Sequence, residues 1–227
     1  MANSTRYTCD FENDTKETWT FCVYQTFPQS TGIQSVAWKQ TTVPKSGNSG
    51  VEWEISYQAC ILNYRQSSGK GVYKASQSLP TELGDKWKVI FEDNVQQLSQ
   101  DGSAPSKNMV LIHNQSSRLA DLGIGMDGDV AAVKPGVYSD NDAQFVVEPT
   151  YWVALFKDLE KGEVISSNQI HGPLEAKFAG GLTSLNYRAW IEGETFRFKE
   201  QNSEQLWIAP VSEIQTKLNI IQSRLTK

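Results

Sequence analysis

Apolar and polar residues alternate with a period of two along much of the chain, which is the pattern of half-buried β-strands. In "VEWEISYQACILNY" (51–64), large apolar residues alternate with acidic and hydroxyl residues as far as Tyr57, after which the phase changes and bulky residues occupy both faces. The stretch "AQFVVEPTYWVALF" (143–156) repeats this pattern, with Pro149 at the change of phase. Because proline lacks the donor that a β-ladder needs, the sequence predicts a bulge or a strand break at Pro149.

The two stretches belong to a longer correspondence between residues 13–80 and 114–174. Apolar positions and turn positions match along both segments, with few identities and with loops of different length. The matched pairs include Asn13 with Asn114, Trp53 with Phe145, and Cys60 with Trp152. An internal duplication explains the correspondence, and a chance match between two β regions is the alternative.

Turn-forming segments separate the apolar stretches at intervals typical of all-β folds. They lie at 28–32, 45–50, 66–71, 100–106 and 179–181. Residues 184–200 read as a hairpin about Glu192-Gly193. The sequence therefore predicts an all-β sandwich or barrel built from two related half-units, with about 14 or more strands. We expect residues 1–227 to form a single compact unit, because no long linker interrupts them.

One amphipathic helix is expected near the C-terminus, at about 212–226. Ile214, Leu218, Ile221 and Leu225 recur at spacings of four, three and four, which places them on one face of a helix. This face could cover a sheet edge or barrel mouth. A second copy of the chain is the other candidate partner, which would make the protein a homodimer through this helix.

Composition and charge exclude several classes of protein. The net charge is −5 and basic residues are not clustered, so a nucleic-acid partner is not expected. No apolar run reaches the length of a membrane span, and the N-terminal residues do not resemble a secretory signal. We expect a soluble, cytoplasmic protein in which Cys9, Cys22 and Cys60 are buried thiols. A Cys9–Cys22 bridge is the alternative, and a removed leader would leave a similar sequence.

Two patterns in the sequence resemble a cofactor motif or a metal site, but neither has the spacing and context that the motif requires. Residues 123–128 match G-x-G-x-x-G, but Pro135 follows too soon for the helix that a dinucleotide fingerprint requires, so we interpret them as a turn. Four aspartates suggest calcium, but they lack EF-hand spacing and fall in two loops at opposite ends of a strand meander. They are Asp127, Asp129, Asp140 and Asp142. We expect neither a cofactor nor a metal.

Aromatic residues on or beside the predicted strands are the least ordinary feature of the sequence. Core packing accounts for most of them, but a β cavity lined by such rings could hold an apolar, planar or glycan ligand. We expect a pocket to be walled by Tyr151 or Trp152 together with Trp53 or Tyr57.

Glu148 and His171 are the candidates for a polar or acid–base group at this pocket. Glu148 interrupts an apolar strand, and His171 is one of only two histidines and would titrate near neutral pH. An outward-facing carboxylate and an ordinary surface histidine are the simpler interpretations. The sequence thus leaves two functions open: a binding module for a small ligand, or a cofactor-free isomerase or cyclase acting on an apolar intermediate. It does not decide whether the protein is an enzyme.

Overall fold

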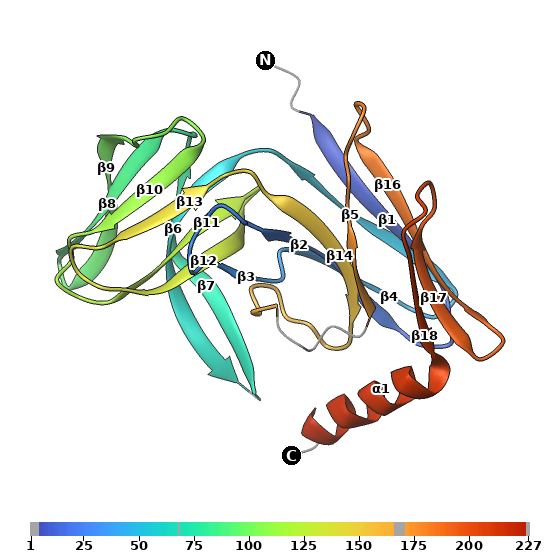
Figure 1. Cartoon of the computed structure of the whole chain (residues 1–227). Helices are drawn as coiled ribbons and strands as arrows, with labels where there is room; N and C mark the ends of the chain where they lie inside the picture. The colour runs from blue at the N-terminus through green and yellow to red at the C-terminus, as the bar shows by residue number, and fades with distance from the viewer. Residues whose placement is uncertain (1–4, 68, 166–170, 226–227) are drawn as a thin grey trace.

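The protein is all-β, as the alternation predicts. The structure, a computed structural model, describes residues 5–67, 69–165 and 171–225. Strands β1 to β18 of this part of the chain form four sheets, and one helix follows them (Figure 1). The sheets pack in pairs to give two β-sandwiches, which lie side by side in Figure 1.

The outer sandwich contains both the first and the last strands of the chain. Its five-stranded sheet has the order β18 (Leu206–Pro210), β17 (Thr195–Glu200), β16 (Ser184–Glu192), β1 (Arg6–Asp14), β5 (Gly47–Glu54). Its four-stranded sheet has the order β15 (His171–Glu175), β14 (Thr150–Phe156), β2 (Trp19–Thr26), β4 (Lys39–Val43). Large buried side chains fill the space between these sheets, among them Phe11, Phe21, Val153, Tyr187 and Phe198.

The inner sandwich is formed mainly by a continuous part of the chain. Its four-stranded sheet has the order β13 (Asp142–Val146), β10 (Met109–Asn114), β8 (Asp85–Glu92), β9 (Val95–Ser103). Its five-stranded sheet has the order β3 (Gln34–Ser35), β12 (Asp129–Val137), β11 (Ala120–Met126), β6 (Tyr57–Ser67), β7 (Lys70–Thr81). A separate core lies between them and includes Val89, Ile112, Leu122, Ile124 and Phe145.

The inner sandwich is thus inserted into the outer one. Apart from the two residues of β3, which join an edge of the inner sandwich between β2 and β4, the chain crosses between the sandwiches twice. The first crossing is at Ile55 and Ser56, between β5 and β6, and the second is at 147–149, between β13 and β14. Both crossings coincide with the changes of phase in the sequence pattern. The strand break predicted at Pro149 is confirmed, and its cause is that the chain leaves one sheet and enters another.

Strand β14 and the first half of strand β6 are buried on both faces, as the apolar run of β14 predicts. One face of β14 contributes Val153 and Leu155 to the core of the outer sandwich, and the other contributes Ala154 and Phe156 to a small cluster. A strap, residues 157–165, runs from β14 to the β6–β7 hairpin. Isolated bridges pair Val36 with Val164 and Val72 with Glu163, so the strap joins the two sandwiches.

The two sandwiches share an order of strands. β1 pairs antiparallel with β5 and parallel with β16, and β10 pairs antiparallel with β13 and parallel with β8. β2 lies between β4 and β14, and β11 lies between β12 and β6. This order is what a duplication would produce if each copy contributed strands to both sandwiches, and the duplication remains a prediction.

Asn13 and Asn114, the first matched pair of the alignment, make corresponding hydrogen bonds. Each is fully buried, and each Oδ1 accepts from the backbone N–H and the hydroxyl of the residue two positions later, Thr15 or Ser116. The Nδ2 of Asn114 donates to the carbonyl oxygens of Arg118 and Val137, at 2.7 and 2.8 Å. These bonds satisfy backbone groups at the start of the hairpin that follows each asparagine.

The strand register differs from the expected match of Cys60 with Trp152. Trp152 pairs with Tyr24, whereas Cys60 pairs with Gly123. When Asn13 is aligned with Asn114 and the strand pairings of the two segments are then compared, Trp152 corresponds to Gln58. Gln58 lies two positions before Cys60. A shift of two keeps the side chain on the same face of the sheet.

The C-terminal helix α1 (Val211–Leu225) begins one residue before the predicted position. Ile214 is buried, and Leu218 and Ile221 pack partly against the core of the outer sandwich. The side chain of Leu225 lies outside the described residues. Ile220 is 47% exposed, so the helix covers one end of the sandwich with a narrow part of its surface.

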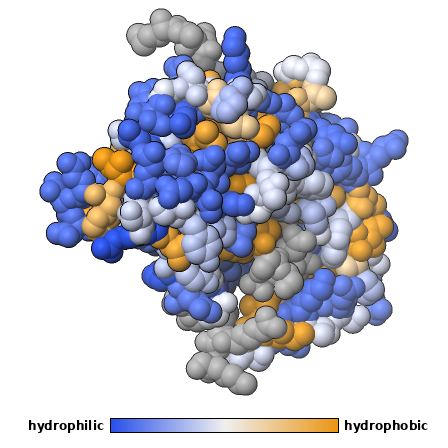
Figure 2. Space-filling view, turned by 60° about the vertical axis from the view of Figure 1, so that its left-hand side comes forward, coloured by the Kyte–Doolittle hydropathy of each residue, from blue (hydrophilic) through white to orange (hydrophobic). Residues whose placement is uncertain are grey.

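The hydropathy of the surface and the burial of the three cysteine thiols are as the sequence predicts. On the face shown in Figure 2 hydrophilic residues predominate, and hydrophobic residues are exposed in small separate groups. Cys9, Cys22 and Cys60 are buried and free, so the alternative of a Cys9–Cys22 bridge is wrong. Burial raises the pKa of the Cys9 and Cys22 thiols, which keeps them protonated. No helix among the described residues has the length and apolar character that crossing a membrane requires.

Candidate functional site

A pocket lined by aromatic rings lies where the chain passes between the two sandwiches. Ile55 of the first crossing and Pro149 of the second both line it. Tyr7 of β1, Tyr151 of β14 and Phe178, which follows β15, form its walls. The volume is about 320 Å³, near the lower end of the range of small-molecule sites. We refer to it as the aromatic pocket.

Trp53 fixes the arrangement of these rings from behind. It is 2% exposed, and its ring centroid lies 6.0 Å from Tyr7, 5.7 Å from Tyr151 and 5.5 Å from Phe178. Phe178 presents its edge to Tyr7 at 5.1 Å and to Tyr151 at 6.0 Å. Aromatic pairs prefer such edge-to-face and tilted arrangements, so the walls are held in place before any ligand enters.

The hydroxyl of Tyr151 donates to Sδ of Met126, at 3.7 Å. Burial, together with the nearby Tyr57 and Tyr7 hydroxyls, raises the pKa of Tyr151 above its ordinary value. Burial and Tyr7 raise the pKa of Tyr57 as well. The phenols therefore stay neutral at physiological pH.

The polar rim of the aromatic pocket is formed by Glu175 and Lys177. Their charged groups pair with each other, with Oε2 and Nζ 3.1 Å apart. The backbone N–H of Glu175 donates to Oε1 of Gln205 at 3.1 Å, which ties the rim to the segment before β18. The rim is thus polar but carries no net charge.

The structure places three of the four predicted ligand-binding aromatics together. Tyr151 lines the pocket, Trp53 lies behind it, and Tyr57 packs against the same cluster at the start of β6. Trp152 points to the opposite face of β14, because successive residues of a strand alternate between faces. There its Nε1 donates to Oγ1 of Thr26 at 2.9 Å, and its ring packs against the small cluster beneath the strap.

His171, one of the two acid–base candidates, does not line the aromatic pocket. It is four residues from Glu175 on β15, a separation of about 13 Å along a strand. It is fully buried: its ring is stacked on Phe196 at 3.7 Å, and the edges of Trp19 and Trp207 lie 4.9 and 4.6 Å away.

Neither ring nitrogen of His171 has a hydrogen-bond partner among the described residues. Burial, with a smaller contribution from Lys217, lowers the pKa of His171 to about 2. The imidazole is therefore neutral at physiological pH and has no access to solvent. His171 belongs to the aromatic core of this end of the sandwich.

Glu148, the other acid–base candidate, lies at the second crossing but faces solvent. It accepts hydrogen bonds from Asn108 Nδ2 at 2.8 Å and Gln29 Nε2 at 3.3 Å. Both contacts are exposed, so Glu148 has the ordinary surroundings of a surface carboxylate.

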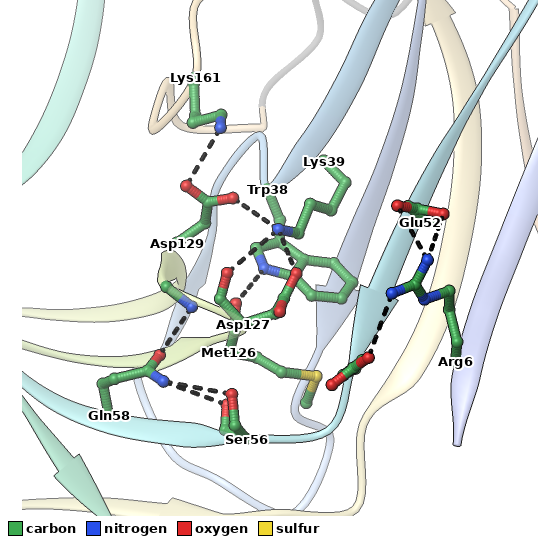
Figure 3. Close-up of polar contacts among 12 residues, drawn as sticks. Arg6, Trp38, Lys39, Glu52, Ser56, Gln58, Met126, Asp127, Asp129 and Lys161 are labelled. Carbon is green, nitrogen blue, oxygen red and sulfur yellow. Dashed lines mark hydrogen bonds and ion pairs between the residues drawn. The ribbon is translucent and has the colours of Figure 1, made fainter. Parts of the chain in front are cut away.

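The aspartates that suggested calcium hold a lysine (Figure 3). Nζ of Lys39 lies 2.8 Å from Oδ2 of Asp127 and 2.7 Å from Oδ2 of Asp129, and Lys161 pairs with the other oxygen of Asp129 at 3.1 Å. Burial opposes the charge on Lys39, but the two carboxylates outweigh it, so the pKa of Lys39 lies above its ordinary value. The ammonium occupies the place that a cation would need.

This ion pair joins the sandwiches, because Lys39 belongs to β4 and the aspartates flank the β11–β12 turn. Asp127 and Gly128 both have positive φ there, as a two-residue Asp-Gly hairpin requires, so the last two of residues 123–128 form a turn. The interpretation as a turn is wrong for residues 123–126, which are the end of strand β11. Asp142 instead pairs with His113 at 2.7 Å. Within the described ranges, no group of three or more His, Cys, Asp or Glu residues could hold a metal ion.

Two walls of the pocket, Tyr7 and Phe178, were not expected from the sequence. Tyr7 belongs to an N-terminal strand whose partner β16 is distant along the chain, so nothing local links it to Tyr151. A weak signal for Phe178 exists: it is a large aromatic residue beside the glycines of "AKFAGG". Residues that bind ligands often lie on loops held by a rigid scaffold.

Comparisons with known proteins give one result. The model of the RhiA family matches residues 4–200, which include the aromatic pocket and both sandwiches but not β18 or α1. Searches of curated proteins and of solved structures gave no match.

Proposed function

The chain belongs to the RhiA family, and we propose that it is a binding module whose aromatic pocket takes up a small, flat, apolar ligand without changing it chemically. The main evidence for this proposal is that Tyr7, Tyr151 and Phe178 surround a hollow of about 320 Å³, with the buried Trp53 behind them. Ring faces and edges form the walls, and such walls favour a planar ligand.

The polar groups favour an apolar ligand over a glycan. Glu175 and Lys177 pair with each other, and the Tyr151 hydroxyl is directed to Met126. A sugar ring would need several free donors and acceptors for its hydroxyl groups, whereas a flat apolar ring needs few. Three unpaired thiols fit a reducing compartment, and we include cytoplasmic residence in the proposal.

A cofactor-free isomerase or cyclase is the second candidate function, and the pocket gives it less support. General acid–base catalysis needs a group that titrates near the working pH and reaches the ligand. His171 is buried about 13 Å away along β15, and Glu148 faces solvent. Glu175 on the rim is paired with Lys177, and burial raises the pKa of Tyr57 and Tyr151 above the ordinary value, so both of these phenols are neutral.

Backbone amide chemical shifts during titration with indole test this proposal. We expect the largest changes at 150–151 and 175–178, where the chain lines the pocket. Tyr151→Ala should weaken indole binding about tenfold or more, since it removes one wall and its edge contact with Phe178.

Tyr138→Ala is the matched control, because Tyr138 is 66% exposed and does not line the pocket. It should leave indole binding unchanged. Shift changes that leave 175–178 unaffected, or turnover of an added ligand, would contradict the binding-module proposal. Methyl glucoside is the counter-probe, and preferential binding of this sugar in the aromatic pocket would replace the apolar ligand by a glycan.

A further inference from the structure

A second hollow lies beside the β6–β7 hairpin, away from the elements that form the aromatic pocket. Its volume is about 350 Å³. It is bounded by β3, by both strands of the hairpin and by the strap. The lining residues are Gln34, Tyr64, Gly69, Lys70, Gly71, Tyr73, Glu163 and Val164. We refer to it as the hairpin hollow.

Tyr64 provides an aromatic platform in the hairpin hollow. Its residue is 49% exposed, yet its ring is fixed: it is tilted against the ring of Tyr73, the residue opposite on β7, with centroids 5.0 Å apart. The ring also lies over Gly71, where an added Cβ would come within 2.7 Å of the Tyr64 hydroxyl. A residue with a side chain at position 71 would therefore displace the platform.

A buried carboxylate stands beside this platform. Glu163 is 3% exposed, and its Oε2 accepts a hydrogen bond from the backbone N–H of Glu160 at 2.9 Å. The backbone of Glu163, which belongs to the strap, is held by a hydrogen bond: the N–H of Ala37 donates to the carbonyl oxygen of Glu163 at 2.8 Å. A carboxylate is costly to bury, so its presence at the wall of a hollow calls for a reason beyond packing.

Lys70 balances the charge of Glu163. Its Nζ lies 3.7 Å from Oε2 of Glu163 and 2.9 Å from Oδ2 of Asp158, and it also donates to the carbonyl oxygen of Asp158. Gln34, exposed on β3, adds an amide that both donates and accepts. The hairpin hollow thus combines donors and acceptors around one ring, with opposite charges side by side.

We infer that the hairpin hollow binds a neutral saccharide. Each sugar hydroxyl both donates and accepts a hydrogen bond, so a sugar ring needs free donors and acceptors together. Lys70 and Oε2 of Glu163 are already paired, whereas the Gln34 amide and Oε1 of Glu163 have no hydrogen-bond partner among the described residues and can supply both kinds of bond. The apolar C–H face of such a ring packs on an aromatic face, which Tyr64 offers. A phosphate or another anion would meet the buried carboxylate of Glu163, and a purely apolar ligand would leave that carboxylate and the ammonium without solvent.

This site is distinct from the aromatic pocket of the proposed function. The two share no lining residue: one is built on β1, β14 and the residues after β15, the other on β3, β6, β7 and the strap. One site can therefore fail its test without affecting the other.

The experiment is a titration of the full chain with neutral mono- and disaccharides, followed by backbone amide shifts and by calorimetry. We expect at least one sugar to shift the amides of 69–73 and 163–164 with millimolar or tighter affinity. Tyr64→Ala should weaken that sugar about tenfold or more, because the stacking surface is lost. Glu163→Gln should weaken it as well, because the amide accepts less strongly than the carboxylate.

Tyr64 is half-exposed, so Tyr64→Ala should fold normally, with a melting temperature lowered only slightly by the loss of the Tyr73 contact and with unchanged indole binding at the aromatic pocket. Tyr138→Ala, the matched control, should keep full sugar affinity. The inference is overturned if no neutral sugar in the panel binds, if Tyr64→Ala binds as well as the unaltered protein, or if inorganic phosphate binds in place of the sugars.

Discussion

Replacing His171 by phenylalanine should make the protein more stable, and more so in mild acid than at neutral pH. Phenylalanine has nearly the shape of the imidazole and can keep the stacking on Phe196 at 3.7 Å. It removes two buried ring nitrogens that have no hydrogen-bond partner among the described residues. Removing an unsatisfied buried polar group is neutral or favourable when the new side chain fits the same space.

The pH dependence follows from the lowered pKa of His171, about 2 in the folded protein against an ordinary value of 6.5. Between these values the unfolded chain binds a proton at this position and the folded protein does not. Stability therefore falls as the pH falls below 6.5, and it is unaffected by His171 above that pH. Each pH unit in this window is worth about 1.4 kcal/mol, so the loss between pH 7.5 and pH 5.0 is about 2 kcal/mol.

Urea unfolding of the unaltered protein and of His171→Phe at these two pH values measures the effect. The carboxylates titrate in both proteins, so the difference between their pH dependences isolates His171. His113→Gln is the matched control: His113 lies near the surface beside Asp142, and its replacement should leave the contribution of His171 in place. Equal pH dependences for the unaltered protein and His171→Phe, or a proton resonance of His171 that titrates near pH 6.5, would refute the reasoning.

Two further predictions concern stability. Asn114→Ala should lower the free energy of unfolding by about 1–3 kcal/mol or more, because the carbonyls of Arg118 and Val137 lose their buried donor; Asn13→Ala should act similarly, and the exposed Asn219→Ala should change the urea midpoint little. Ending the chain after Ala209 should lower the melting temperature, since Ile214 alone contributes about 1.5–3 kcal/mol by its burial. An unchanged melting temperature of the shortened chain would show that α1 does not support the sandwich. Light scattering on the unaltered and the shortened chain tests the predicted homodimer. If the unaltered chain is already monomeric, pairing through the helix is excluded.

Local features of the fold could be predicted from the sequence because short-range chemistry determines them. The alternation gives the strands, Pro149 marks the crossing between β13 and β14, Asp-Gly gives the β11–β12 turn, and the helical spacing gives α1. The pairing of strands could not be predicted. Thr8 and Ser184 are neighbours in parallel strands although 176 residues separate them, and no local pattern specifies such a partner.

The residues of the candidate site could likewise be predicted only in part. Trp53, Tyr57 and Tyr151 could be identified because all three lie near the changes of phase, and these are the crossings at which the aromatic pocket forms. The face on which Trp152 lies depends on the strand register, which the sequence alone does not fix. The burial of His171 depends on Trp19, Phe196 and Trp207, which distant strands bring together.

The insertion of one sandwich into the other has a consequence for the order of events during synthesis. At typical elongation rates, the 176 residues between Thr8 and Ser184 take about 10–35 s to appear. Residues 57–146, which supply nearly all of the inner sandwich, are synthesised before β14, which follows directly, and well before β16. During that interval β1 can pair with β5 and β2 with β4, but β1 lacks β16 and β2 lacks β14. Each therefore has one unpaired edge, and unpaired strand edges are the usual starting points of aggregation. Translation speed through residues 147–190 therefore sets how long the N-terminal strands remain without their partners.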